Sequence, residues 1–343
     1  MRSYARLELE LRPGVVLAVG PNGAGKTNLL ESVHLGTQGF SPRTRSDAEI
    51  VRFGESEARV GVTGERAPSL PVEVELTLRP GRGKQARLNG AHLRAAELLR
   101  GELAVLVFTP DRLAVVKGGP ALHRAYFDRV LGRLFPARAT LSAEYGAALG
   151  QRNAALRRVA AGLSSSDALA PWTARVATLA AELVRGRRET LALLNPPFAR
   201  LAFEFGLAEA RLEYGGAAPS VEEIDARLGR DLDRGFTGIG PHLDDVGILA
   251  GERDLRSFGS QGEQRVSVLA LLLAEADLLR ERRDGPPLLL LDDVLSELDP
   301  ERRETLVRLL PSDGQTLVTA TSASALPGEP SQLLNVRPGR VDA

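Results

Sequence analysis

A phosphate-binding loop set between a strand and a helix constrains the fold of this chain more than any other feature. The loop is Gly20-Pro-Asn-Gly-Ala-Gly-Lys-Thr27, a complete match to the pattern G-x-x-x-x-G-K-[ST]. The apolar run at 15–19 before it is typical of a buried strand, and residues 28–33 after it begin a helix. Strand, loop and helix in this order predict an α/β fold in which backbone N–H groups and a helix N-terminus surround a phosphate chain.

The loop also predicts which residues hold a nucleotide. Lys26 is expected to reach the β- and γ-phosphates, and Thr27 is expected to ligate Mg²⁺. The residues predicted to contact the nucleotide here are Gly20, Pro21, Asn22, Gly23, Ala24, Gly25, Lys26, Thr27 and Asn28. The alternative is a glycine-rich turn without a ligand, and the complete match with both flanks disfavours it.

An apolar strand that ends in two acids predicts the other side of the site. Residues 288–291 are four leucines, and Asp292 and Asp293 follow them. Such a run fits a strand buried on both faces of a parallel sheet, where ligands bind at the carboxyl ends of the strands. Asp292 is therefore a predicted Mg²⁺ ligand, as the Walker-B aspartate is in P-loop ATPases. Asp293 is predicted to orient or deprotonate the attacking water, and an N-cap role is the alternative.

A third motif, Ser260-Gln-Gly-Glu-Gln-Arg265, opens an apolar helix predicted over 261–282. A serine hydroxyl and backbone N–H groups at a helix N-terminus suit an anion. The motif suggests that one ATPase head closes over the nucleotide of another head.

A further segment, ending at Asp299, and the residue Thr321 are predicted to line the nucleotide sites. The segment from Ser296 to Asp299 is expected to be a loop between two such sites, with a capping box as the alternative. Thr321 follows an apolar strand and is a predicted γ-phosphate sensor.

Composition limits the remaining possibilities. The chain has 343 residues, no cysteine, and 44 basic against 44 acidic residues. No signal-peptide pattern and no apolar run of about 20 residues is present, so a cytoplasmic protein without a membrane anchor is expected. Because the net charge is zero, any DNA site must be a local patch. The candidate patches, each of which is also compatible with a plain solvated face, are Arg43 and Arg45; Arg82, Lys84 and Arg87; Arg157 and Arg158; and Arg185, Arg187 and Arg188.

The order of the predicted elements divides the chain into three parts. Residues 1–112 and 201–343 are predicted to form one split α/β head, and 113–200 a helical lobe inserted into it. Alternating residues at 60–63 and 71–79 predict antiparallel strands. Apolar spacing over 141–163 and 169–194 predicts an antiparallel helical hairpin, with Ser166 or Asp167 as N-cap of the second helix.

The second helix of the hairpin is expected to end at Asn195-Pro-Pro197, since proline lacks the N–H that a helix interior needs. Strands are predicted at 201–205, 210–214 and 246–249, and a helix at 221–234.

Several strings along the chain resemble one family closely. The ATPase motifs together look like the ABC-type head shared by transporters, SMC proteins and their DNA-repair relatives. Within that group the chain resembles the RecF family of bacterial recombination mediators. The strings that carry this resemblance are residues 20–32, Phe108-Thr-Pro-Asp-Arg-Leu113, Val116-Lys-Gly-Gly-Pro120, Arg124-Ala-Tyr-Phe-Asp128, Gly240-Pro-His-Leu-Asp-Asp245, Ser260 to Arg265, and Asp292 to Asp299.

The resemblance implies an ATP-dependent homodimer. Ser260 and Gly262 of one subunit would contact the γ-phosphate that Lys26 of the other subunit holds. A RecF-like protein is expected to bind double-stranded DNA and single-strand/double-strand junctions and to work with RecO and RecR in loading RecA. Its hydrolysis of ATP, with Mg²⁺, is expected to be slow, stimulated by DNA, and to time release.

The chain departs from its relatives at several positions. Transporter ATPases usually have Glu where this chain has Asp293 and carry His near Thr321, and Leu243 stands where the RecF family commonly has Arg. Residues 2–9 match only the second half of the family's first strand, so about ten residues are expected to precede them. His242, between Pro241 and Asp244, is the one histidine with a suspected functional role, a structural turn being the alternative.

Other classes of function remain open at this point. A transporter-type ATPase subunit is disfavoured by the helical insertion and the paired aspartates. A binding module that ATP switches without hydrolysis stays possible because Asp293 is a short base. A small-molecule P-loop kinase would leave the motif from Ser260 to Arg265 without a role.

Overall fold

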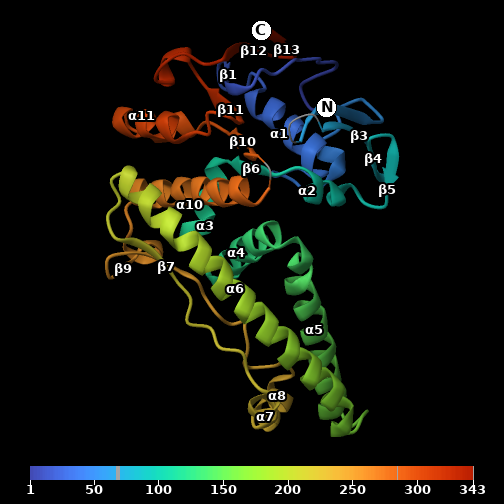
Figure 1. Cartoon of the computed structure of the whole chain (residues 1–343). Helices are drawn as coiled ribbons and strands as arrows, with labels where there is room; N and C mark the ends of the chain where they lie inside the picture. The colour runs from blue at the N-terminus through green and yellow to red at the C-terminus, as the bar shows by residue number, and fades with distance from the viewer. Residues whose placement is uncertain (67–69, 284, 343) are drawn as a thin grey trace. The chain divides into compact units, whose positions relative to one another are not determined.

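The computed structural model describes residues 1–66, 70–283 and 285–342, and the chain divides into two compact units (Figure 1). Unit 1 joins Met1–Arg112 to Val268–Ala343, and unit 2 is Leu113–Ser267. The predicted division placed 201–267 with the α/β head, whereas these residues pack within unit 2. The fold class itself, an α/β ATPase head with an inserted helical lobe, is confirmed.

A six-stranded sheet forms the centre of unit 1. Its order is β13-β12-β1-β11-β10-β6, parallel except for the edge strand β13. The strands are β1 Gly14–Val19, β6 Val105–Phe108, β10 Leu288–Leu291, β11 Gln315–Ala320, β12 Gln332–Arg337 and β13 Arg340–Asp342. Leu289, Leu290 and Leu291 are fully buried, which confirms the prediction that the four leucines form a strand covered on both faces.

The helices of unit 1 lie between its strands in the sequence. They are α1 Lys26–Gln38, α2 Leu99–Glu102, α11 Pro300–Leu309 and, shared with the end of unit 2, α10 Gln261–Arg282. The core under α1 contains Leu29 and Leu30 with Val16, Ala18 and Leu290. The predicted helix over 261–282 is therefore confirmed by the bounds of α10.

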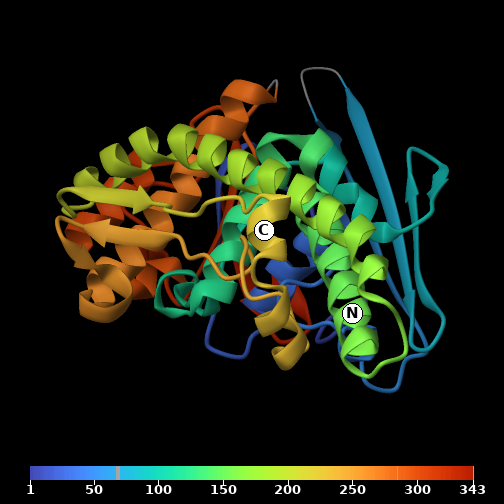
Figure 2. The same cartoon turned by 90° about the horizontal axis from the view of Figure 1, so that it is seen from below.

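A second sheet in unit 1 is fully antiparallel, in the order β2-β3-β4-β5. Its strands are β2 Ala58–Glu65, β3 Pro71–Arg79, β4 Gly83–Leu88 and β5 Ala91–Leu93. Figure 2 shows them in blue to cyan as long ribbons. Val74, Leu76 and Leu78 of β3 alternate into a core with Leu35 of α1, as the period of two predicts.

Unit 2 is built on a helical hairpin. Helices α5 Leu141–Ala160 and α6 Ala170–Glu204 lie side by side in Figure 1. The remaining elements are α3 Ala114–Lys117, α4 Pro120–Leu134, α7 Val221–Asp225, α8 Leu228–Arg234, α9 Leu255–Phe258 and the antiparallel sheet of β7 Ala210–Glu213, β8 Gly247–Ala250 and β9 Arg253–Asp254. Tyr145 and Ala148 of α5 pack with Val176 and Leu183 of α6 and with Ile224 of α7 in one apolar core.

Helix α6 overturns one prediction, because it runs through Pro196 and Pro197 to Glu204. The predicted helix end at 195–197 and the predicted strand at 201–205 are both wrong. Phe198 and Leu201 beyond the prolines are buried, so packing outweighs the two missing N–H donors. The Asn195 side chain also exchanges two hydrogen bonds with the backbone of Leu212 in β7, at 2.9 and 3.1 Å, which ties this part of the helix to the sheet.

Smaller corrections concern helix starts and the N-terminal segment. Neither Ser166 nor Asp167 caps α6, which begins directly after a 3-10 turn at Ser166–Leu169. The predicted helix over 221–234 is split into α7 and α8, and Ser220 forms a capping box with Glu223 at the start of α7. Residues 2–9 form no strand; the chain before β1 is instead held by side-chain bonds from Gln315 and Gln332.

No helix in the described part of the chain is long and apolar enough to cross a bilayer.

Candidate nucleotide site and signature motif

The loop between β1 and α1 has the backbone that its glycines predict. Gly23 and Gly25 have φ of 80° and 110°, in a region that side chains rarely adopt. A Cβ on Gly20 would lie 2.3 Å from the carbonyl oxygen of Val336, so only glycine fits there. Asn22 and Gly23 are exposed at the tip of the loop and Ala24 is buried under it. The loop is therefore open to a ligand on one side and packed on the sheet on the other.

Lys26 is buried and folded back over this loop. Its Nζ donates to the carbonyl oxygens of Gly20 at 2.7 Å and of Pro21 at 3.1 Å. Both acceptors belong to the loop itself, so the ammonium group lies where phosphate oxygens would replace them.

The two predicted Mg²⁺ ligands meet although they are far apart in the sequence. Thr27 Oγ1 donates to Asp292 Oδ1 at 3.1 Å, and Thr319 Oγ1 donates to the same oxygen at 2.7 Å. Burial raises the pKa of Asp292, and these hydroxyl bonds offset that effect only in part. A divalent cation between Thr27 and Asp292 would stabilise the ionised carboxylate, so the donor set fits Mg²⁺.

Asp293 is held in an unusual conformation beside this pair. Its φ is 51°, in the left-handed region, and its N–H donates to Thr319 Oγ1 at 2.9 Å. Its Oδ1 is buried without a hydrogen-bond partner. Asp293 precedes a 3-10 turn at Val294–Glu297 but its side chain does not cap that turn. A strained backbone that aims an unpaired carboxylate oxygen fits a group awaiting a water or a ligand better than it fits a cap.

Thr319 is a site residue that the sequence motifs do not identify. It is fully buried in β11 and contacts both aspartates. Thr321, which was predicted as a γ-phosphate sensor, is exposed just after β11, where Ala320 O accepts the Gly20 N–H at 3.3 Å. The only sequence signal for Thr319 is a hydroxyl residue within an apolar strand.

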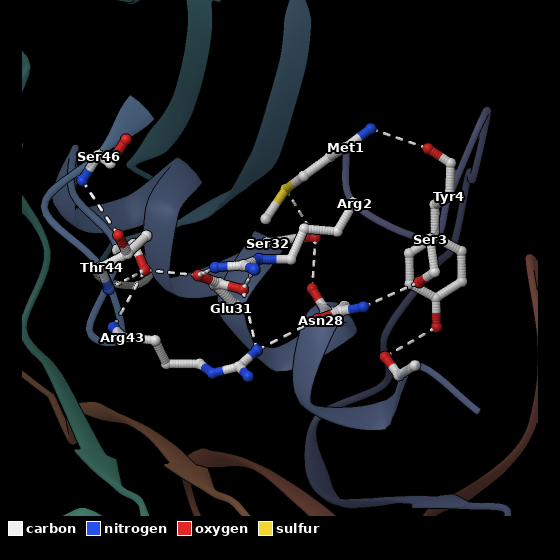
Figure 3. Close-up of polar contacts among 12 residues, drawn as sticks. Met1, Arg2, Ser3, Tyr4, Asn28, Glu31, Ser32, Arg43, Thr44 and Ser46 are labelled. Carbon is white, nitrogen blue, oxygen red and sulfur yellow. Dashed lines mark hydrogen bonds and ion pairs between the residues drawn. The ribbon is translucent and has the colours of Figure 1, made fainter. Parts of the chain in front are cut away.

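The start of α1 carries a polar cluster that includes the N-terminal residues (Figure 3). Asn28 Nδ2 donates to Ser3 Oγ at 3.0 Å, and Tyr4 Oη donates to Gly25 O at 3.0 Å. Burial raises the pKa of Tyr4 to about 12, so its hydroxyl keeps the donated proton. A cavity of about 610 Å³ opens beside Asn28 and Arg2, within the size range of ligand sites.

Arg43 belongs to the same cluster, whereas the sequence suggested it only as part of a DNA patch. Its Nη1 lies 3.2 Å from Asn28 Oδ1 and 3.3 Å from Glu31 Oε2 (Figure 3). Glu31 is fully buried and also pairs with Arg2 at 2.6 Å. The charge of Arg43 lowers the pKa of Asp292, which places this arginine in the electrostatic surroundings of the nucleotide site.

The signature motif forms a capping box at the N-terminus of α10, within unit 2. Glu263 N–H donates to Ser260 Oγ at 3.2 Å, and Ser260 N–H donates to Glu263 Oε2 at 2.8 Å. The Arg253 guanidinium, 2.7 Å from Glu263 Oε1, and the Ser260 N–H hold the pKa of Glu263 at about 2. The cap uses Ser260 as an acceptor only, so its O–H, together with the helix end at Gly262, remains able to donate to an anion.

Comparison with known proteins places the chain in a family. A family model described as the RecF/RecN/SMC N terminal domain matches residues 1–338. The DNA replication and repair protein RecF of Heliobacterium modesticaldum is 37% identical over 348 residues, covering 97% of this chain and 92% of that protein. RecF of Acidothermus cellulolyticus is 39% identical over 343 residues, covering 93% and 91%. The chain belongs to the RecF family.

Solved structures agree with this assignment. A structure of the recombination mediator RecF with ATP, from the RecFOR pathway, has a TM-score of 0.87 and 28% identity, covering 99% of this chain and 94% of that one. An SMC head bound to the C-terminal winged-helix domain of ScpA has a TM-score of 0.61 at 15% identity, covering 99% and 93%, and shows the shared fold alone.

The string Gly240-Pro-His-Leu-Asp-Asp245 is a turn in which Gly240 and Pro241 are buried and Leu243 is exposed. His242 Nδ1 lies 2.7 Å from Tyr145 Oη, and its Nε2 lies 3.0 Å from Thr237 O. Burial lowers the pKa of His242, which favours the neutral ring. These bonds account for His242 as a turn residue, and no cluster of three metal-ligating side chains occurs among the described residues.

The predicted DNA patches of this RecF-family chain differ in exposure. Arg187 is buried and pairs with Asp128 at 2.8 Å, so its assignment to a surface patch is wrong. Arg157, Arg158 and Arg185 are exposed on the helical hairpin. Lys84 pairs with Asp47 at 3.4 Å and with Glu97 at 3.3 Å, which reduces the positive charge it offers.

Asp299 caps α11, since its Oδ1 accepts the Arg302 N–H at 3.0 Å. Ser296 lies in the preceding 3-10 turn and donates to Asp293 O at 2.8 Å. The four residues therefore do not form a capping box of their own; Ser296 and Glu297 lie in the 3-10 turn, and Asp299 is the N-cap of α11.

Proposed function

We propose that this chain is a DNA-binding ATPase of recombinational repair that binds ATP with Mg²⁺ and dimerises head-to-tail when ATP is bound. The observation that carries the proposal is the convergence of Thr27, Asp292 and the unpaired Asp293 beside the phosphate loop. The ATP in the related RecF structure and the names of the curated relatives support the same reading.

Each site residue has a separate part in this function. Lys26 and the loop N–H groups hold the β- and γ-phosphates, with Asn28 at the start of α1. Thr27 and Asp292 hold Mg²⁺, which neutralises charge on the phosphates. Asp293 orients or deprotonates the attacking water. Asp is one methylene shorter than the Glu common in transporter ATPases, so turnover is slow and hydrolysis times release from DNA.

Ser260 and Gly262 act on the nucleotide of the second subunit. The Ser260 hydroxyl and the N-terminus of α10 together supply donors for a γ-phosphate. Asp299 follows β10 and Thr321 follows β11, two strands that pair in parallel, and both residues would meet the nucleotide when two heads close.

The DNA-related part of the function follows from the family. The partners are single-strand/double-strand junctions and double-stranded DNA, and the mediators RecO and RecR, with which the protein helps to load RecA. Because the net charge is zero, exposed arginines such as Arg158 and Arg185 are the groups available to contact phosphates. DNA is expected to stimulate the ATPase.

Solution mass with and without Mg·ATP, measured by light scattering on wild type and Ser260→Arg, tests the dimer. Wild type should double in mass with Mg·ATP, whereas the variant should remain a monomer because arginine fills the space of the partner's γ-phosphate. A fluorescent ATP analogue should bind both proteins equally, since the variant's own phosphate loop is unchanged.

Ser220→Arg is the matched control. Ser220 forms the same kind of capping box with Glu223, with Glu223 N–H at 3.2 Å and Glu223 Oε2 at 2.7 Å, so both variants lose an equal cap of about 1 kcal/mol. The control should dimerise as wild type does. The head-to-tail dimer would be ruled out if the mass of Ser260→Arg doubled with Mg·ATP as that of wild type does, or if the mass of wild type did not change with ATP.

A further inference from the structure

Residues 241–245, called here the 241–245 loop, collect bonds from every large element of unit 2. Arg187 of α6 donates to Pro241 O at 2.7 Å, and Tyr145 of α5 lies 2.7 Å from His242. Arg124 of α4 donates to Asp244 O, and Tyr214, just after β7, donates to Asp244 Oδ2 at 2.6 Å. The loop is therefore fixed to three helices and to the end of a strand.

Asp245, the last residue of this loop, points its two oxygens in different directions. Oδ1 lies 2.7 Å from Nδ1 of the buried His123 on α4 and accepts the Val246 N–H at 2.8 Å. Oδ2 lies 3.7 Å from Arg256 Nη1, on α9. The carboxylate thus joins the fixed part of unit 2 to a helix of only four residues.

Helix α9 ends directly before the signature motif, and the turn between them is closely packed. Leu255 O accepts both the Gly259 N–H at 3.2 Å and the side chain of the buried Gln264 at 2.8 Å. A Cβ on Gly259 would lie 2.5 Å from that same oxygen, so the chain is packed closely here. Because α9 and the start of α10 share one carbonyl, a displacement of α9 displaces Ser260.

We propose that Asp245 is a positioning residue for the signature serine: through Arg256 it holds α9 so that Ser260 and the N-terminus of α10 fit the nucleotide of a second copy of this chain. The inference rests on the proposed ATP-dependent dimer and adds to it the residues that set the geometry of its donor. It also gives unit 2 a route to influence dimerisation, since a ligand that shifts α4, α5 or α6 shifts the loop that Asp245 terminates.

The ion pair of Asp245 and Arg256 is expected to affect the position of α9 more than the stability of the fold. Arg256 and Asp245 are about two-fifths exposed, at 40% and 38%, and such pairs contribute little to stability. Loss of the pair should therefore leave the monomer folded and able to bind ATP, and the effect should appear when Ser260 must meet the partner.

The experiment compares the dissociation constant of the Mg·ATP dimer, by sedimentation, in Asp245→Asn, Arg256→Gln and the double variant. Each single change should weaken the dimer about twofold to fivefold, the effect of one half-exposed ion pair. The double variant should be no weaker than the worse single variant, because both changes remove the same ion pair while the asparagine oxygen still accepts the bonds that Oδ1 accepts. Arg256→Lys, which keeps the charge, should dimerise nearly as wild type does.

Glu213→Gln is the control, since Glu213 forms a similar half-exposed pair with Arg211 at 2.9 Å in the same unit, away from α9. It should leave dimerisation unchanged. Wild-type dimerisation in both single variants, additive losses in the double variant, or a fall in melting temperature and ATP binding beyond that of the control would each overturn the positioning role. Failure of Ser260→Arg to block dimerisation would instead overturn the dimer itself, so the two failures are distinguishable.

Discussion

Two buried aspartates in this molecule have opposite electrostatic surroundings. Asp231 in unit 2 and Asp292 in unit 1 are 1% and 6% exposed. Asp231 Oδ2 accepts a bond of 3.0 Å from Arg152, which is itself fully buried, and its Oδ1 accepts the Gly238 N–H at 3.0 Å. Asp292 accepts bonds from the hydroxyls of Thr27 and Thr319 and, among the described residues, forms no ion pair.

We interpret this difference as that between a structural acid, Asp231, and the proposed metal ligand, Asp292. The charge of Asp231 is compensated within the chain, by a cation that α5 supplies and that also holds Thr173 and Thr237. Asp292 accepts bonds only from neutral hydroxyls, and the charge of Arg43 offsets its burial only in part, so a bound cation would stabilise its ionised form. A buried acid with its own counter-ion serves the fold, whereas a buried acid without one is prepared for a ligand.

Removal of the counter-ion of Asp231 should have the largest effect on stability. Arg152→Met leaves a buried carboxylate without a partner and should lower the free energy of unfolding by about 3–5 kcal/mol. Chemical denaturation of the full chain measures this loss. Arg158→Met, an exposed arginine on the same helix, should change stability by less than about 0.5 kcal/mol. If Arg152→Met were as stable as Arg158→Met, Asp231 would not depend on its counter-ion.

Substitution of the acid Asp292 should have the opposite effect on stability. Asp292→Asn keeps the volume and an acceptor for the hydroxyls of Thr27 and Thr319 but removes the uncompensated charge. Without Mg²⁺ it should raise the free energy of unfolding by about 1 kcal/mol, as substitutions in destabilised active sites often do. It should also reduce Mg²⁺-dependent ATP hydrolysis at least about 100-fold, because the metal ligand is lost.

Thermal unfolding in the presence of a chelator and a steady-state ATPase assay measure the two effects of Asp292→Asn. Asp313→Asn is the control, an exposed aspartate of the same unit that pairs with Arg280 at 2.7 Å. It should change neither quantity. A clear loss of stability in Asp292→Asn would mean that Asp292 is a structural acid like Asp231, and the contrast between the two sites would fail.

The sequence predicted the two sites unequally, for a physical reason. Lys26 and Thr27 were predicted because the phosphate loop fixes their types at short spacing, and Asp292 was predicted because it ends a run of buried leucines. Thr319 was missed because it meets Asp292 only through the pairing of β10 with β11, which no local pattern reports. The pair of Arg152 and Asp231 was missed for the same reason: Arg152 falls on the apolar stripe predicted over 141–163, but its contact joins α5 to α8, and Asp231 resembles a surface residue in the sequence.

The predicted end of α6 was wrong because tertiary packing outweighs the local preference of proline. Proline lacks the N–H that a helix interior uses, yet Phe198 and Leu201 lie buried beyond it. The assignment of 201–267 to the head followed from that error, since a helix that continues to Glu204 carries β7 into unit 2. Strands and motifs that rest on local periodicity were therefore predictable, and the boundary between the units was not.

The smallest expected effect is the pH dependence of the stability difference between wild type and Asp292→Asn. Burial raises the pKa of Asp292 in the folded chain above its ordinary value. The folded protein therefore binds more protons than the unfolded chain between the ordinary and the raised pKa, and stability falls as pH rises through that window. The variant cannot titrate at this position, so its advantage should be full at neutral pH and should vanish at pH values below the ordinary pKa of an aspartate. Thermal melts of both proteins with a chelator, across a pH series, measure the difference in stability between them. A difference that stays constant with pH would show that folding leaves the pKa of the Asp292 carboxylate unchanged, which would contradict an uncompensated charge at this position.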